Sequence, residues 1–561
     1  MTERLQSHFT RRDALLSMTA AASALVASGR RVQASLVEDS EIACGIVYED
    51  VSGGISESAL RRGIAGIMVS NGRDVTLTAE NGAWTLPVKC GDSVFIIKPA
   101  HWSVVQCHTA TERGHAGCYL HCPNGTPDAL DIARPHISET GKIPASIDFK
   151  LLRTPESQRF DVMLVADTQA ANADELNYAR AELTDCIAAT TPAFAIHHGD
   201  VMGDDLSLFA DHLAMTRATG IPWYHCPGNH DMNLDSPSNA HAFDAWKQAF
   251  GGTNMALNYA GATFILLNNI SYDGKGAPRR DGRGYKGLIG ADQLQFVANV
   301  LKHTPADNLI VVSMHIPLVS FDNPDSVSDT TADRHALMSL LASRPHAVSF
   351  AGHSHTTEHH YLGVEHGFTG DTQHHHHVLT AASGAWWSGR ADVRGVPISD
   401  SRDGTPKGVH ILSVDGNRYT TRLVTSPCAH GQTLRAMVAS LAGQAPNELQ
   451  ASPHIVVDVF DGGPKTSVTC RSAVFGDAPV ALERTAIADP YIVESYARDK
   501  ALSKPWVAPA LSSHIWTIQL PNAIDGDALD FVIGVTTEFG EQYDVAVTLA
   551  APASVNDALR T

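Results

Sequence analysis

Between residues 158 and 428 the chain alternates unbroken apolar runs with helical patterns, and this alternation constrains its fold most. Residues 162–166 (VMLVA) and 193–196 (AFAI) are apolar throughout, and apolar residues recur at steps of three and four between them. Strands with this composition occur where helices cover both faces of a parallel or mixed sheet. The sequence therefore predicts an α/β domain. Further strands are expected at 221–226, 262–268, 308–314 and 347–351.

Residue types that bind metal ions follow these apolar runs directly. They are Asp167, Asp200, Asn229, His230, His315, His353 and His355. Because the carboxyl ends of strands line the ligand crevice in sheets of this kind, we expect these side chains to gather at one rim. Carboxylate and imidazole groups suit manganese, iron or zinc better than calcium. The pattern thus indicates a transition-metal site.

Five short motifs, in this order, resemble those of the calcineurin-like metallophosphoesterases. They are Asp167-Thr168-Gln169, Gly199-Asp200 with Asp204, Gly228-Asn229-His230-Asp231, the lone His315, and Gly352-His353-Ser354-His355. The resemblance implies a four-layer α/β sandwich, two β-sheets flanked by helices, that hydrolyses phosphoric esters. Stretches within 45–78, 386–419 and 454–464 are similar to a bacterial branch of this superfamily. That branch has an N-terminal prealbumin-like β domain and a C-terminal β domain.

The resemblance also implies a role for each motif residue. Two divalent ions (Mn, Fe or Zn) would activate a water between them, and Asp200 would bridge the ions. His230 would protonate the leaving oxygen, with Asp204 or Asp231 orienting its ring. The remaining ligands would be Asp167, Gln169 and His355 for the first ion, and Asn229, His315 and His353 for the second.

Two positions distinguish this chain from other members of the superfamily. Gln169 stands where the family usually has His, so an amide oxygen would replace an imidazole at the first ion. The same form occurs in a bacterial branch, so we expect the metal site to persist. Purple acid phosphatases need a metal-bound Tyr where this chain has Gly203, which argues against an iron–tyrosinate centre.

Several other residues are compatible with two interpretations. His198, Lys286 and Trp386 could contact the substrate or serve only in packing. The run His374-His375-His376-His377 could hold an independent metal ion, but it is more typical of a strand or loop edge near the site. These residues are therefore candidates for the substrate pocket rather than for the metal centre.

The flanking regions have the patterns of β domains. Short apolar or alternating runs, separated by turn residues, predict a small β domain at 41–100 and a β-sandwich at 450–552. Residues 101–157 lack strong periodicity and are expected to be a connecting segment. The nine cysteines are an odd number, so at least one stays unpaired in a monomer. Cys118 and Cys122 could form a local disulfide, part of a zinc site, or neither.

The N-terminus resembles a twin-arginine export signal over residues 1–34. Arg11-Arg12 precede an Ala-rich apolar stretch that is too short to span a bilayer, and no later segment is long and apolar enough. We therefore expect export to the periplasm or cell surface and no transmembrane segment. The net charge of −19, without a basic run, argues against a nucleic-acid-binding surface.

The sequence leaves the substrate open. A small phosphate monoester, a diester and a phospholipid-like ester are all compatible with these motifs. An alternative function is a cell-surface protein that binds glycans or lipids and keeps a degenerate phosphoesterase core. The complete Asp200, Asn229, His230 and GHSH motifs favour the enzyme.

Overall fold

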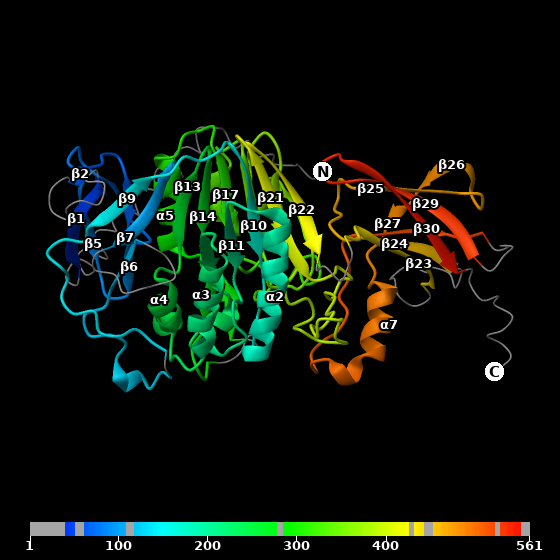
Figure 1. Cartoon of the computed structure of the whole chain (residues 1–561), viewed down its shortest axis with the longest axis horizontal. Coiled ribbons are helices and arrows are strands. Elements are labelled where there is room, and N and C mark those ends of the chain that lie inside the picture. The colour runs from blue at the N-terminus through cyan, green and yellow to red at the C-terminus, as the bar shows by residue number, and fades with distance from the viewer. Residues whose placement is uncertain are drawn as a thin grey trace, which may run out of the picture.

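The structure is a computed structural model of the whole chain. It describes residues 40–50, 61–107, 117–133, 135–277, 284–425, 431–441, 453–521 and 528–550. The expected export signal at 1–34 lies outside these residues. Figure 1 shows the N-terminal strands at one end of the molecule, a mixed region of helices and strands in the middle, and the C-terminal strands at the other end.

The first central sheet has the strand order β12-β11-β10-β21-β22. β10 (Arg159–Val165), β11 (Phe194–His198) and β12 (Trp223–Cys226) run parallel, whereas β21 (Gly408–Asp415) and β22 (Arg418–Thr425) are antiparallel. Every residue of β11 is buried, as expected for a strand covered on both faces. The parallel strands therefore end at one common edge.

The second central sheet has the order β13-β14-β17-β18-β20-β19. Its strands are β13 (Met255–Tyr259), β14 (Ala262–Leu266), β17 (Leu309–Ser313), β18 (Ala347–Ala351), β19 (Glu358–Leu362) and β20 (His374–Val378). β14, β17, β18 and β20 are parallel to one another. A small two-stranded sheet of β15 (Ile270–Tyr272) and β16 (Tyr285–Gly287) lies beyond the main ones.

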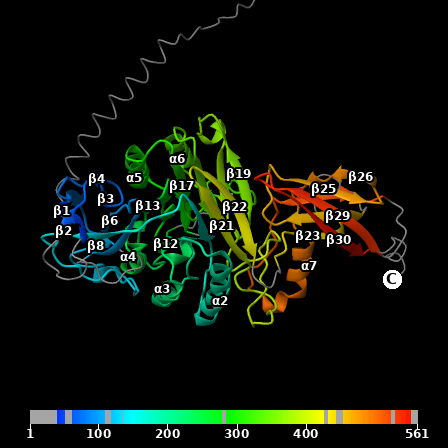
Figure 2. The same ribbon diagram turned by 45° about the horizontal axis from the view of Figure 1, so that its top comes forward.

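The two central sheets pack face to face between two layers of helices. Phe194 of the first sheet meets Phe264 of the second edge-on, with ring centroids 5.2 Å apart. The outer face of the first sheet is covered by α2 (Ala173–Thr190), α3 (Phe209–Ala218) and α4 (Asp244–Phe250). The outer face of the second is covered by α5 (Ala291–Lys302) and α6 (Arg334–Leu341). Figure 2 shows these helix groups on opposite sides of the strands, and the expected four-layer α/β sandwich is confirmed.

The N-terminal region consists of two packed sheets. The first contains β1 (Glu41–Asp50), β2 (Arg61–Gly63), β5 (Ala83–Val88), β7 (Trp102–Cys107) and β9 (Phe149–Arg153). The second contains β3 (Met68–Ser70), β4 (Val75–Leu77), β6 (Asp92–Ile96) and β8 (Cys118–His121). A buried apolar cluster that includes Trp84, Phe149 and Tyr119 joins them.

Residues 101–157 differ from the expected connecting segment because they supply β7, β8 and β9 to these sheets. β9 pairs in parallel with β1, from which it is separated by about a hundred residues, and antiparallel with β7. These strands are short and mix polar with apolar residues, so their pairing leaves little periodicity in the local sequence. The N-terminal β region therefore extends to Arg153.

The C-terminal region is a β-sandwich with an apolar interior. One sheet contains β23 (Leu434–Ser440), β24 (Pro453–Val459), β27 (Glu483–Arg484) and β28 (Ile515–Gln519). The other contains β25 (Ser467–Ser472), β26 (Gly476–Ala481), β29 (Ala528–Thr536) and β30 (Gln542–Ala550). β23 places the start of this region before residue 450.

The sandwich also carries α7 (Pro490–Arg498). Among the described residues, no helix is long and apolar enough to cross a membrane.

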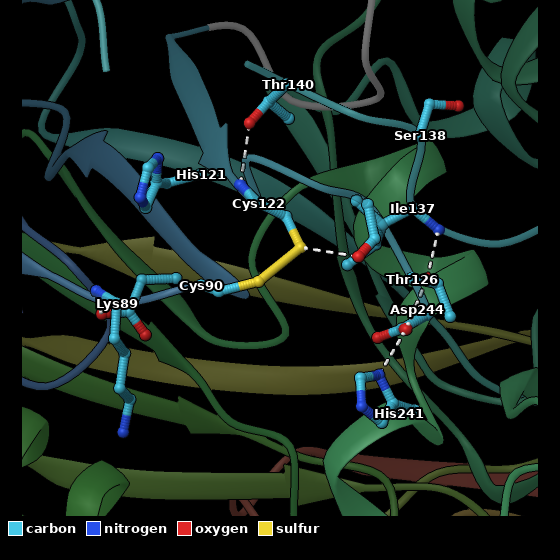
Figure 3. The surroundings of a disulfide bond; sticks show 12 residues. Lys89, Cys90, His121, Cys122, Thr126, Ile137, Ser138, Thr140, His241 and Asp244 are labelled. Atoms are coloured by element: carbon cyan, nitrogen blue, oxygen red, sulfur yellow. Dashed lines mark hydrogen bonds and ion pairs between the residues drawn. A yellow bond between two sulfur atoms is a disulfide. The ribbon is translucent and has the colours of Figure 1, made fainter. Parts of the chain in front are cut away.

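The structure pairs Cys122 with Cys90 and not with Cys118 (Figure 3). Cys118 and Cys122 stand four residues apart along extended backbone, which separates them by about 13 Å and prevents a local bridge. Cys90 instead comes from the turn before β6, and its Cα lies 4.4 Å from that of Cys122. Of the possibilities that the sequence left open for Cys118 and Cys122, the local disulfide is therefore excluded.

Candidate active site

The residues expected to bind metal ions lie in loops at the carboxyl ends of the central strands. Asp167 and Gln169 follow β10, Asp200 follows β11, Asn229 follows β12, His315 follows β17, and His353 and His355 follow β18. All of these side chains are buried. The structure therefore brings the whole expected ligand set to one rim, contributed by both central sheets.

One group of ligands surrounds the imidazole of His315. Its Nε2 lies 3.0 Å from Oδ1 of Asn229 and 3.3 Å from Oδ2 of Asp200. Nδ1 of His353 lies 3.1 Å from the same Nε2 atom of His315. The Nδ1–H of His315 donates to the backbone carbonyl of His198 at 2.8 Å. Nε2 therefore faces the oxygen atoms of Asn229 and Asp200, an arrangement that suits a shared cation.

His353 is anchored in the same manner. Its Nε2 lies 3.1 Å from Oδ1 of Asp329, which leaves Nδ1 facing His315 and Asp200. The ligand atoms of Asp200, His315 and His353 all lie within 4.8 Å of one another. Asp329 was not among the residues expected at the site. It lies in the irregular segment between β17 and α6, where no sequence pattern distinguishes it.

A second group contains Asp167, Gln169 and His355. The Nδ1–H of His355 donates to the backbone carbonyl of Gly384 at 2.5 Å. Its Nε2 lies 2.9 Å from Oε1 of Gln169 and 3.8 Å from Oδ1 of Asp167. The backbone N–H of His353 donates to Asp167 at 2.9 Å, which joins the two groups. The imidazoles of His315, His353 and His355 thus each have one anchored nitrogen and one nitrogen facing other candidate ligands.

The buried charges of the site also fit divalent metal ions. Burial raises the pKa of Asp167 to about 7, and Asp200 adds to the rise while His315 opposes it. Burial acts on Asp200 too, but positive charge on His315 and His230 holds the pKa of Asp200 below its usual range. Two carboxylates this close and this buried repel each other, and cations between them would relieve that repulsion.

Close approach of the loops requires glycine at two positions. A Cβ on Gly228 would lie 1.9 Å from the backbone nitrogen of Asp200. A Cβ on Gly352 would lie 2.4 Å from Oδ2 of Asp167. The glycines of the GNHD and GHSH motifs therefore let the loops of the two sheets come together at the carboxylates.

His230 lies at the mouth of the site and is not one of the clustered ligands. Its Nδ1 lies 2.7 Å from Oδ1 of Asp204, and its side chain is 35% exposed. Burial lowers the pKa of His230, but Asp200, Asp204 and Asp231 together raise it to about 9. The ring is therefore protonated at neutral pH, with Nε2 left to face a substrate.

Asp204, rather than Asp231, contacts the ring of His230. The Asp231 carboxylate instead accepts backbone N–H groups of Val201, Met202 and Gly228 at 2.8–3.1 Å. It thereby ties the loop after β11 to the loop after β12. Of the two residues expected to orient His230, the structure selects Asp204.

A pocket of about 670 Å³ opens over these residues. Trp386 forms part of its wall and stacks on His355, with ring centroids 4.0 Å apart. Beyond the candidate ligands and His230, sequence reasoning missed most of the wall, because it comes from loops, from the end of β15 and from the C-terminal region. These further lining residues include Leu234, Tyr272, Lys275, Arg402, Lys504 and Trp506.

Two other candidates lie away from this pocket. Lys286 is not among its lining residues, which include the preceding Tyr285 instead, since alternate residues of β16 point in opposite directions. His198 is fully buried and contacts the carbonyl of Val165 and the hydroxyl of Ser313. The run from His374 to His377 forms β20, a buried strand rather than a loop edge.

Comparison with known proteins agrees with this geometry. Residues 160–357 match the family model of calcineurin-like phosphoesterases, and residues 376–543 match the model of the C terminal of calcineurin-like phosphoesterases. No curated protein matches the sequence.

Two solved structures are among those similar to the chain. A dimetal phosphatase from Danio rerio has 14% identity and a TM-score of 0.30, covering 48% of this chain and 99% of its own. A purple acid phosphatase from yellow lupin (Lupinus luteus) seeds has 11% identity and a TM-score of 0.34, covering 75% of this chain and 67% of its own.

Proposed function

Since the chain belongs to the calcineurin-like phosphoesterase family, we propose that it is an exported hydrolase that uses two divalent ions to cleave a small phosphate ester. Membership of the family makes it a metal-dependent phosphoric ester hydrolase. The alternative of a binding protein with a degenerate core would require a damaged ligand set. The observation that carries the proposal is the convergence of Asp167, Asp200 and three anchored imidazoles at one rim.

The residues divide between two ion positions. Asp200, Asn229, His315 and His353 would hold one ion, while Asp167, Gln169 and His355 would hold the other, with Asp200 shared. When bound, the ions would supply an activated water as nucleophile and would neutralise the phosphoryl oxygens. Imidazole, carboxylate and amide oxygen donors favour manganese, iron or zinc.

His230 is placed to protonate the leaving oxygen. Asp204 holds Nδ1, so the Nε2 proton is the one available for transfer to a substrate in the pocket. General acids of this kind contribute typically about 10²–10⁴-fold in rate. Asp204 positions the ring and does not itself contact the reacting atoms.

The pocket favours a small ester with a flat apolar group. Lys504 is paired with Glu175 at 2.7 Å, and Arg402 with Asp322 at 3.3 Å, so much of the wall's positive charge is already neutralised. Trp506 instead offers an exposed aromatic surface. Metal ions would thus bind the phosphate while aromatic side chains bind the organic part.

The bridging carboxylate provides the test of this function. Asp200→Asn keeps the shape of the side chain but removes its negative charge, so both ions should bind much more weakly. We expect turnover of phosphate esters to fall by at least about 10³-fold while the fold survives, because metal ions supply several kcal/mol of charge stabilisation. Metal content by mass spectrometry and steady-state rates measure this. Two tightly held ions with full turnover in the variant would refute the bridging role.

Export rests on the sequence of the N-terminus alone. Because the twin-arginine pathway reads the Arg pair, changing Arg11 and Arg12 to Lys should retain the precursor in the cytoplasm. Cell fractionation and blotting of both forms measure this. Unchanged export of the double Lys variant would contradict the proposed route without affecting the proposed chemistry.

A further inference from the structure

A second group of metal-ligand residues lies outside the active site, where β19 and β20 meet the C-terminal sandwich. His359 and His377 stand directly opposite each other in this antiparallel pair. Their rings stack with centroids 3.9 Å apart and planes 23° apart. Asp461, in the turn after β24, reaches both rings from the C-terminal region. The three ligand atoms lie within 4.8 Å of one another.

The distances within this group match those of a bound ion. Nε2 of His359 lies 3.1 Å from Oδ1 of Asp461, and Nε2 of His377 lies 3.3 Å from the same oxygen. Zinc–ligand bonds of about 2.0–2.1 Å place neighbouring ligand atoms of a tetrahedral site about 3.3 Å apart. Both measured separations are therefore close to the edge of such a tetrahedron.

The outer nitrogens of both rings have partners of their own, so both Nε2 atoms face Asp461, to which that of His359 is hydrogen-bonded. Nδ1 of His359 lies 2.9 Å from Nε2 of His375, whose Nδ1 lies 2.8 Å from the hydroxyl of Tyr419. Nδ1 of His377 lies 3.5 Å from Oγ1 of Thr421. Metal-binding imidazoles are usually held in this way, with the second nitrogen hydrogen-bonded to an outer group.

The Nε2 atom of His377 is not satisfied by hydrogen bonds within the part of the protein that the structure describes. Among the described residues, its buried Nε2 has no hydrogen-bond partner of good geometry, and the nearest acceptor is Oδ1 of Asp461 at 3.3 Å. A proton on Nε2 would lack a well-placed acceptor, and a lone pair there would face a carboxylate. A cation between the two groups removes both conflicts.

His410 adjoins the group but is not a ligand. The backbone N–H of Thr380 donates to its Nε2 at 3.3 Å, so the neutral ring carries its proton on Nδ1. That nitrogen lies 3.6 Å from Asp461 and has no lone pair to offer. The ligand set is therefore limited to two imidazoles and one carboxylate.

We propose that His359, His377 and Asp461 bind a divalent ion of the zinc type, separate from the active-site ions, that ties the catalytic α/β sandwich to the C-terminal sandwich. The donor set of two imidazole nitrogens and a carboxylate suits zinc. The Asp461 side chain is 20% exposed, which gives an ion a path from solvent. The fourth position falls to water or to the second oxygen of Asp461. The role is structural, because none of the three residues lines the active-site pocket.

Metal counting on the full chain tests this site. The wild-type protein, His377→Gln and Asp461→Asn are dialysed against metal-free buffer after zinc loading, and zinc per chain is measured by mass spectrometry. Both variants should hold one ion fewer than wild type. His360→Gln is the matched control, because His360 is the next residue in β19 and contacts Glu358 at 2.8 Å instead of the cluster. His360→Gln should keep the wild-type zinc count. The double variant Asp200→Asn/His377→Gln should hold one zinc ion fewer per chain than Asp200→Asn alone.

A measurement on the unchanged protein covers the case in which the variants fail to fold. Crystals of the zinc-loaded wild-type chain should show an anomalous peak at the zinc edge between His359, His377 and Asp461. Equal zinc counts in wild type, His377→Gln and His360→Gln would overturn the proposal. An active-site anomalous signal without one at this position would overturn it as well, and neither result bears on the phosphoesterase activity.

Discussion

At the scale of single residues, the position of His230 distinguishes the proposed general acid from the candidate metal ligands. Its ring contacts Asp204 and lies outside the group formed by Asp200, His315 and His353. Its loss should therefore leave the metal ions in place and affect only the step that needs a proton.

We predict that His230→Ala retains the wild-type metal content and loses activity selectively. Alkyl phosphate esters have poor leaving groups and should lose about 10²–10⁴-fold in kcat, whereas nitrophenyl esters leave as stabilised phenolates and should lose far less. The protonated ring is the active form, so the wild-type rate on alkyl esters should fall as pH rises through the pKa of His230, which is about 9 without metal ions. That alkaline decline should be absent from the variant.

The control is His353→Ala, which removes a metal ligand. It should weaken attack on alkyl and nitrophenyl esters alike and should lower the metal content. Equal losses on both esters for His230→Ala, together with a missing ion, would show that His230 is a ligand.

The residues that gather at the candidate metal site could be predicted from the sequence, but the groups that orient them could not. Asp167, Asp200 and the histidines stand directly after apolar runs, where position in the chain implies position at the sheet edge. Their anchors are the carbonyls of His198 and Gly384 and the carboxylate of Asp329. A backbone carbonyl has no sequence signature, and Asp329 lies in a loop without periodicity.

At the scale of elements, the loops that carry the ligands are held in unfavourable backbone conformations. The φ angles of Asp167, Gln169, Asp200, His353 and His355 lie between 41° and 79°, in the left-handed region. Such conformations cost of order 1–3 kcal/mol each and persist where the surrounding structure imposes them. The strands fix the ends of these loops, and the loops in turn aim the ligands at one point.

A buried charged group also joins β24 and β28 to the catalytic region. Nδ1 of His514 lies 2.6 Å from Asp458, and its Nε2 lies 2.9 Å from Asp403. Burial lowers the pKa of His514, but the two carboxylates raise it to about 10. The folded pKa thus exceeds the ordinary value of 6.5, and the charged ring stabilises the fold.

We predict a pH dependence of stability that traces to His514. Its contribution should be complete below about pH 6.5 and should be lost as pH rises toward about 10, because the unfolded chain releases the proton first. Removing one member of a buried ion pair costs about 3–5 kcal/mol, so His514→Gln should lower the melting temperature at neutral pH. Thermal unfolding of both proteins from pH 6 to 10 measures this. Parallel pH profiles would show that His514 is not the titrating group.

Element boundaries were less predictable than the central strands. Most of the central parallel strands, such as β10, β11, β14 and β17, contain unbroken apolar runs, so their sequences are distinctive. β7, β8 and β9 depend on pairing with distant partners, as in the parallel pair β1–β9, and their sequences carry no comparable pattern. Cys90 and Cys122 likewise meet only through the register of β6 and β8.

At the scale of the whole molecule, the C-terminal region completes the active-site pocket. Trp506 follows α7 and is 60% exposed, and its ring lies 6.4 Å from that of Trp386 at 82°. The sequence predicted a separate C-terminal β domain but not this contribution, since a turn beyond a helix gives no sign of what it faces. The catalytic sandwich alone would have an incomplete wall.

We predict that Trp506→Ala weakens binding of aromatic phosphate esters. An aromatic contact is worth about 0.5–1.5 kcal/mol, so KM should rise about 2- to 13-fold while kcat changes little. Small alkyl esters should be unaffected, and Trp506→Phe should restore part of the loss. Steady-state kinetics on matched aryl and alkyl esters measure this. An equal rise in KM for both esters would contradict a stacking role.

Lys504 and Trp506 stand more than a hundred residues beyond His355, the last of the candidate active-site ligands, so part of the pocket wall is encoded far along the gene from the residues that would bind the ions. Selection can then alter one stretch while the other stays fixed. Changes in residues 490–506 could therefore alter the pocket wall without changing the residues that would bind the ions. The two parts of the pocket can in this respect evolve separately, although they lie side by side in the folded protein.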